Sequence, residues 1–140
     1  MTSEDTAIER SFCQCHTIAV VGLSPKPHRD SYRVSQYMQA QGYRIIPVNP
    51  LAQEVLGERA YATLSEAAQH TQIDMVNCFR NAQDIPPIAN EAIALGAKAL
   101  WLQIGIVHAG AAALATQAGL WVVQDRCLMV EHARWARQHR

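Results

Sequence analysis

One stretch decides how this chain folds: Thr17-Ile18-Ala19-Val20-Val21-Gly22-Leu23-Ser24. Its first five residues form an uninterrupted run of β-branched and apolar side chains, which is typical of a strand buried on both faces of a parallel sheet. A glycine ends the run, and a segment of helical period begins at Ser31. The stretch therefore predicts the first strand and the first turn of a βαβ unit.

The rest of the chain repeats this alternation. Further strands are expected at residues 44–48, 73–79, 99–103 and 120–123, and helices at residues 3–14, 31–41, 64–69, 86–95, 109–118 and 127–138. The pattern predicts an α/β protein with a three-layer, Rossmann-like, doubly wound fold around a five-stranded parallel sheet. The simplest strand order is 3-2-1-4-5, which puts the topological switch between the first and fourth strands. Pro47 removes one ladder donor from the second strand.

Length and composition exclude several classes of protein. The 140 residues, of which 49% are apolar and 17% charged, suit one globular domain over residues 1–140, with an opening helix in residues 1–15. The 12 basic and 12 acidic side chains cancel, so no overall field draws the chain to nucleic acid or to a membrane surface. The shortage of charge favours a homo-oligomer such as a homodimer.

Targeting and cysteine usage indicate the compartment. The chain has no apolar stretch long enough for a signal peptide or a membrane span. Four cysteines without an export signal are expected to be reduced thiols of a cytoplasmic protein. Cys13 and Cys15 with His16 lack the paired spacing of a zinc site, so we expect no metal.

The loop after the first strand gathers groups that bind phosphate. Lys26 and Arg29 supply positive charge, Ser24 and Ser31 supply hydroxyl donors, and the next helix begins with free backbone N–H groups. Parallel sheets of this kind bind ligands at the carboxyl ends of their strands. Candidate ligand-binding residues that follow the other strands are Asn49, Pro50, Phe79, Arg80 and Gln103.

This loop lacks two common nucleotide-binding fingerprints. It has neither the glycines of G-x-G-x-x-G nor the pattern G-x-x-x-x-G-K-[ST], so it supports neither a standard dinucleotide site nor a P-loop. Asn49 and Pro50 stand where a dinucleotide fold has an acidic residue for the ribose. A long loop with several cations instead suits a ligand that carries a diphosphate and a further phosphate.

Several motifs occur in order along the chain. They are residues 18–24 with Arg29 and Ser31, residues 42–44 with residues 47–50, residues 76–80, residues 101–106 and residues 125–132. Together they resemble the small CoA-binding proteins related to the nucleotide-binding domain at the start of the succinyl-CoA synthetase alpha subunit. The resemblance covers nearly the whole chain.

The resemblance implies a Rossmann-like domain that binds CoA or an acyl-CoA as its ligand. The positions that it assigns to CoA contact are Gly22, Leu23 and Ser24 on the phosphate side, and Leu102, Gln103 and Ile104 at a strand end. The ligase forms acyl-CoA with a phosphohistidine in a second domain and with a partner subunit, and 140 residues leave room for neither. We therefore expect a CoA-binding module that does not itself catalyse acyl transfer.

Residues near the end of the chain leave other interpretations open. Cys127 follows Arg126 at the start of the last predicted helix, where it is either a thiolate that exchanges with a CoA thiol or a small buried core residue. The alternatives to a binding module are thus a thiol-dependent CoA redox or acyl-CoA enzyme that uses Cys127, and an NAD-type nucleotide-binding enzyme. Glu131 and His132 are expected on a solvated helix face, and Trp101 either fills the core or supports the site from behind.

Overall fold

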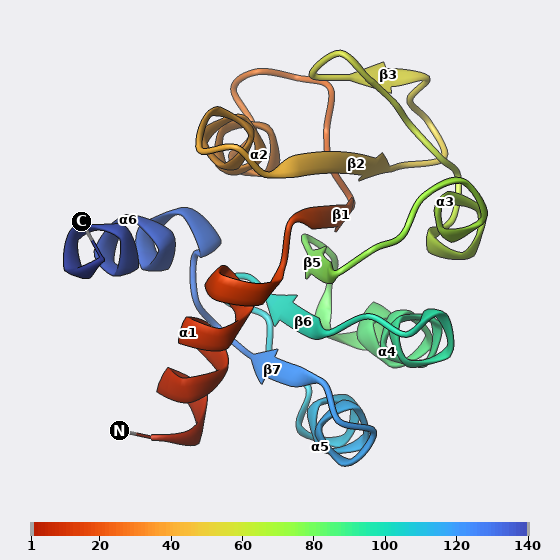
Figure 1. Cartoon of the computed structure of the whole chain (residues 1–140). Coiled ribbons are helices and arrows are strands. Elements are labelled where there is room, and N and C mark those ends of the chain that lie inside the picture. The colour runs from red at the N-terminus through yellow and green to blue at the C-terminus, as the bar shows by residue number, and fades with distance from the viewer. Residues whose placement is uncertain (1, 140) are drawn as a thin grey trace.

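The protein is described by a computed structural model covering residues 2–139, which has three layers (Figure 1). The helices are α1 (Ser3–Gln14), α2 (Asp30–Ala40), α3 (Leu64–His70), α4 (Ile85–Leu95), α5 (Ala109–Gln117) and α6 (Leu128–Gln138), with a short 3-10 helix, η1 (Ala82–Asp84). The strands of the main sheet are β1 (Thr17–Val21), β2 (Arg44–Val48), β5 (Met75–Cys78), β6 (Ala99–Leu102) and β7 (Trp121–Val123). The predicted α/β, Rossmann-like fold is confirmed, and the bounds of these elements lie within two residues of the predicted ones.

The order of strands in the sheet differs from the expected one. It is β2-β1-β5-β6-β7, with every neighbouring pair parallel, so the order 3-2-1-4-5 is wrong and the third main strand lies beside the first. The topological switch therefore lies between β1 and β5. Pro47 fits this order because its carbonyl accepts from the Tyr61 N–H on the side away from β1. The Pro47 nitrogen, which has no hydrogen to donate, faces that same side. The proline therefore costs β2 no hydrogen bond to β1.

The two faces of the sheet pack against separate apolar cores. Along β1, Ile18 and Val20 contact the core under α1, α2 and α6, whereas Ala19 contacts the core under α3, α4 and α5. All three side chains are completely buried. Successive strand residues point to opposite faces, so a strand covered on both sides must be apolar throughout.

Local caps begin and end the helices. Before α1, the Thr2 hydroxyl accepts from the Asp5 N–H and the Asp5 carboxylate accepts from the Thr2 N–H, and these hydrogen bonds lower the pKa of Asp5. Thr63 caps α3 by accepting from the Glu66 N–H. Gly96 ends α4 with a φ of 80°, in the left-handed region that favours glycine.

A short antiparallel hairpin, β3 (Glu54–Val55) with β4 (Glu58–Arg59), follows β2 and was not predicted. Its strands have two residues each, which is too short for an alternating pattern to be recognised in the sequence. In Figure 1 it lies beyond β2, at the outer edge of the main sheet.

Glu131 and His132 are buried rather than solvated as expected, with 8% and 4% of their surface exposed. The Glu131 carboxylate accepts from Arg126 and Arg134, and the His132 ring packs edge-on against Phe12. Burial lowers the pKa of His132. The burial of Glu131 and His132 could not be predicted from the charged sequence of α6, because the helix that covers them, α1, comes from the other end of the chain.

Candidate functional site

The loops after β1 and β5 meet at the topological switch of the sheet. The chain leaves β1 for α2 on one face and leaves β5 for α4 on the other, so the two loops diverge outside the strand ends (Figure 1). Such a crevice is the usual ligand site of an open parallel sheet. Two adjoining cavities occupy it, and both include Asp30 and Phe79 in their walls.

Gly22 lets the two loops approach closely. Its φ is +89°, and a Cβ at this position would lie 2.7 Å from the Phe79 carbonyl oxygen and 3.1 Å from Cδ of Arg80. The Gly22 N–H donates to the Val48 carbonyl at 2.9 Å, which fixes the turn against the end of β2. Only glycine combines this φ with so close a backbone neighbour. Gly22 thereby sets the position of Phe79, the wall that the two cavities share.

The first cavity, called here the loop cavity, has a volume of about 610 Å³. Its walls are Gly22, Ser24, Pro25, Lys26, Arg29, Asp30, Ser31, Asn49, Leu51 and Phe79. The Ser31 hydroxyl oxygen accepts from the Ser24 N–H at 3.0 Å, and the Ser24 hydroxyl oxygen accepts from the Lys26 N–H at 3.1 Å. These bonds shape the loop and leave both hydroxyl protons available to a ligand.

The loop cavity offers positive charge and free donors. Within residues 2–139, neither Lys26 nor Arg29 forms an ion pair. The backbone N–H groups of residues 30–32, in the first turn of α2, have no hydrogen-bond partner in the same described range. Unpaired N–H groups at a helix start and unpaired cations are groups whose chemistry suits phosphate.

The second cavity, called here the apolar cavity, has a volume of about 550 Å³. Its apolar walls are Val34 of α2, Phe79 of the loop after β5, Ile104 and Ile106 of the loop after β6, and Met129 and Val130 of α6. Arg33, Arg80, Asn81, Gln103, Gly105 and Cys127 complete the lining with Asp30. Both cations of this lining have carboxylate partners, since Arg33 pairs with Asp30 and Nε of Arg80 lies 3.7 Å from Oδ2 of Asp84. This cavity therefore suits an uncharged part of a ligand.

A buried amide pair lies at the carboxyl ends of β5 and β6. The Gln103 side chain is 5% exposed and lines the apolar cavity, and its Nε2 donates to Oδ1 of Asn77 at 2.9 Å. Asn77 is completely buried, in register with Val20 on one side and Trp101 on the other. Its Nδ2 has no partner, and in the described part of the chain neither does Oε1 of Gln103. The pair thus carries unused hydrogen-bonding capacity.

Cys127 enters the wall of the apolar cavity as the residue that precedes α6. Trp101 supports this segment from behind, because its Nε1 donates to the Arg126 carbonyl at 2.8 Å while the ring is completely buried. The Arg126 guanidinium points to α1, where its Nε lies 2.7 Å from Oε1 of Glu4, and that bond raises the pKa of Arg126. Arg126 therefore holds α1 to this segment and is already paired with carboxylates.

The structure gathers most of the predicted ligand-binding residues and leaves three aside. Leu23 and Leu102 are completely buried in the two cores, and Pro50 lines neither cavity. Asn49 lines the loop cavity, yet its amide is occupied by the Leu23 carbonyl and the Leu51 N–H. The apolar walls from α2 and α6 were not predicted, because their only signal in the sequence is the apolar character of Val34, Met129 and Val130.

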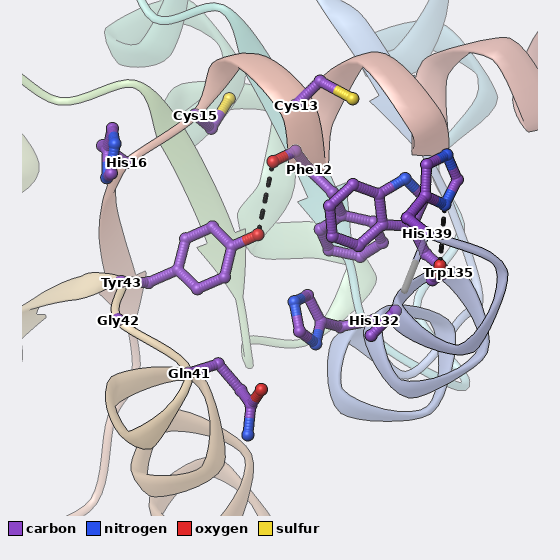
Figure 2. A pocket seen from close by; sticks show the side chains of 11 residues that line it. Phe12, Cys13, Cys15, His16, Gln41, Gly42, Tyr43, His132, Trp135 and His139 are labelled. Atoms are coloured by element: carbon purple, nitrogen blue, oxygen red, sulfur yellow. Dashed lines mark hydrogen bonds between the residues drawn. The ribbon is translucent and has the colours of Figure 1, made fainter.

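A third cavity, the aromatic cavity, lies at the amino-terminal ends of β1 and β2, away from the carboxyl ends that carry the other two cavities. Figure 2 shows the side chains that line it. It has a volume of about 340 Å³ and is lined by residues that precede β1 and β2 and by α6, among them Phe12, Cys15, Tyr43, His132 and Trp135. The Tyr43 hydroxyl donates to the Phe12 carbonyl at 3.3 Å. Burial raises the pKa of Cys15 and of Tyr43 to about 12. None of the predicted ligand-binding residues lies here.

The described residues hold neither a metal-binding cluster nor a membrane-spanning helix. No group of three or more His, Cys, Asp or Glu side chains in residues 2–139 is arranged to hold a metal ion. Over the same range, no helix has the length and apolar character needed to cross a membrane.

Comparison with known proteins assigns the family. A family model described as a CoA binding domain matches residues 16–133. The uncharacterized protein YneT of Bacillus subtilis (strain 168) is 43% identical over 116 residues, which cover 83% of this chain and 84% of YneT. A solved structure of a hypothetical protein from Pyrococcus horikoshii OT3 is 36% identical, with a TM-score of 0.86 over 96% of this chain and 92% of that one. Another, cell-free ID.343 from Thermus thermophilus, is 38% identical, with a TM-score of 0.83 over 96% of this chain and 98% of that one. The resemblance inferred from the motifs is confirmed, and this chain belongs to the CoA-binding domain family.

Proposed function

We propose that this protein binds CoA across the two adjoining cavities at the topological switch, with the phosphates in the loop cavity and the uncharged arm in the apolar cavity. The observation that carries the proposal is the contrast between the two cavities, which meet at Asp30 and Phe79. CoA has a matching division, because its phosphates gather at the nucleotide end and its long arm, which ends in a thiol, carries no charge.

The loop cavity supports the phosphate half of this proposal. Lys26 and Arg29 are exposed and unpaired within residues 2–139, and the start of α2 adds free N–H groups. The site is neutral elsewhere, since Arg33 and Arg80 have carboxylate partners. Binding should consequently weaken as salt concentration rises, because the contributing cations lie in water.

The apolar cavity supports the arm half. It opens beside Ile104 and Val130, which are 68% and 47% exposed, so a group attached to the thiol has room at the rim. The protein therefore accepts CoA and short acyl-CoA with similar affinity. NAD carries a charged nicotinamide nucleoside in place of this long uncharged arm, so we expect it to bind less tightly than CoA.

Isothermal titration calorimetry with reduced CoA tests the proposal. Lys26→Ala and Arg29→Ala should each weaken CoA binding by roughly tenfold, the value of one partly exposed contact between a cation and a phosphate. Arg10→Ala is the matched control, because Arg10 is an exposed cation on α1, outside both cavities. NAD and acetyl-CoA are titrated in parallel.

The proposal fails if CoA does not bind, or if the two loop variants bind it as tightly as the Arg10→Ala protein. Tighter binding of NAD than of CoA would instead support the dinucleotide alternative.

A further inference from the structure

We propose that Cys127 forms a reversible mixed disulfide with the thiol of CoA bound in this site. The inference rests on the proposed function, because it needs CoA seated across the two cavities. It adds a redox-controlled covalent step: CoA is retained while the mixed disulfide persists and is released when a reductant reduces that disulfide.

The position of Cys127 among the four cysteines is the first argument. Cys127 lines the apolar cavity, which would hold the arm that ends in the CoA thiol. Cys78 is completely buried in the core, where burial raises its pKa to about 12. Cys13 and Cys15 line the aromatic cavity, at the amino-terminal ends of β1 and β2. Cys127 is therefore the cysteine that CoA would meet.

The Gln103 side chain in the same cavity is the second, independent argument. Gln103 is 5% exposed and lines the cavity, and its Oε1 has no partner among the described residues, while Nδ2 of its neighbour Asn77 is buried and unpaired. An acceptor without a protein partner, on a side chain that is almost fully buried, points to a ligand that donates a hydrogen bond in this cavity. The arm of CoA carries amide groups upstream of its thiol. An arm held at Gln103 brings that thiol into the cavity that Cys127 lines.

The surroundings of Cys127 suit thiol exchange. The residue is partly exposed and makes no side-chain cap bond, although it occupies the position that precedes α6. Cys127 is therefore accessible to a disulfide from the cavity that it lines.

The step is a thiol–disulfide exchange with the disulfide of CoA as co-reactant. The Cys127 sulfur loses its proton to water and attacks one sulfur of CoA disulfide. A bond forms between Cys127 and that CoA, and the S–S bond of CoA disulfide breaks. The second CoA leaves as a thiolate and takes up a proton. Cys127 is oxidised and the departing CoA is reduced, so no other oxidant is needed.

Intact-mass spectrometry tests the inference on the full-length protein treated with CoA disulfide. The wild type should gain one CoA per chain, and a reductant should remove it. The Cys127→Ser protein should gain none, with a circular dichroism melt to show that it is folded. Cys13→Ser is the matched control, because Cys13 is exposed and lies outside both binding cavities, and it should react as the wild type does.

A second measurement asks whether binding directs the reaction. CoA disulfide should modify Cys127 at least about tenfold faster than glutathione disulfide does, because the site positions the reacting sulfurs. Lys26→Ala should slow the reaction with CoA disulfide and leave the reaction with glutathione disulfide unchanged.

The outcomes separate this inference from the proposed function. If reduced CoA binds in calorimetry but Cys127 is not modified, or is modified no faster than Cys13, the mixed disulfide is refuted and CoA binding stands. If reduced CoA does not bind, the proposed function fails and this inference fails with it.

Discussion

Replacing Gly22 with alanine should reduce both the stability of the protein and its affinity for CoA. The added methyl group has two separate costs. A φ of +89° places alanine in the left-handed region, at about 1–2 kcal/mol. The new Cβ would lie 2.7 Å from the Phe79 carbonyl oxygen, and moving that backbone apart costs about 1–3 kcal/mol, as overpacking of a core does. We expect the free energy of unfolding to fall by roughly 2–5 kcal/mol.

Gly42 provides the control for the first of these costs. Its φ is +100°, and a Cβ built there has no atom within 4 Å. Gly42→Ala therefore has the strained φ without the close approach, and should cost only about 1–2 kcal/mol. The difference between the two variants isolates the contact between the loops after β1 and β5.

Urea denaturation of both variants without ligand, followed by tryptophan fluorescence, measures the difference. Calorimetry with CoA then measures the consequence for binding. Because Phe79 lines both cavities, its displacement in Gly22→Ala should weaken CoA binding by about tenfold. Gly42 lies at the aromatic cavity, so Gly42→Ala should bind CoA as the wild type does. Equal losses of stability in the two variants would refute the close approach as the reason for glycine at position 22.

Three further substitutions test other parts of the structure. Cys127→Ser should raise the free energy of unfolding by about 0.5–1 kcal/mol, because serine at the position before α6 caps the helix where cysteine makes no cap bond; an unchanged melting temperature would show that it does not cap. His132 has its pKa lowered by burial from the ordinary 6.5, so the unfolded chain takes up the proton first and stability falls as the pH drops below that value. Unfolding at about pH 8 and about pH 5 should show a smaller loss in His132→Gln than in the wild type, and the same loss in both would contradict this origin. Trp101→Phe removes the bond to the Arg126 carbonyl and should cost about 1–3 kcal/mol in urea unfolding, whereas a neutral effect would mean that this bond does not hold the segment before Cys127.

The sequence predicted what depends on neighbouring residues. Runs such as residues 17–21 identify strands because a strand covered on both faces is apolar at every position. The end of the helix at residue 95 was predictable because Gly96, which favours a helix end, follows it directly. The loop that we propose binds phosphate could also be identified, because its cations and hydroxyls are close together in the chain.

Strand order was partly visible in the sequence and was misjudged. Pro47 in the second strand is a signal for an edge position, because proline has no N–H for a ladder bond on that side. In the expected order that strand lies between two others, and Pro47 would have left one neighbour without a bond. The observed order places it at the edge and moves the switch to β1 and β5.

The sequence by itself thus determined the six helices and the five strands of the main sheet, the fold class, the family and the loop that we propose binds phosphate. Only the tertiary structure decided which distant segments meet. Three contacts join segments that are far apart in the sequence. They are the close approach of Gly22 to Phe79, the hydrogen bond between Gln103 and Asn77, and the position of Cys127 in the apolar cavity. Capping and periodicity act between residues a few positions apart, whereas these contacts depend on the order of strands and on the packing of helices over them.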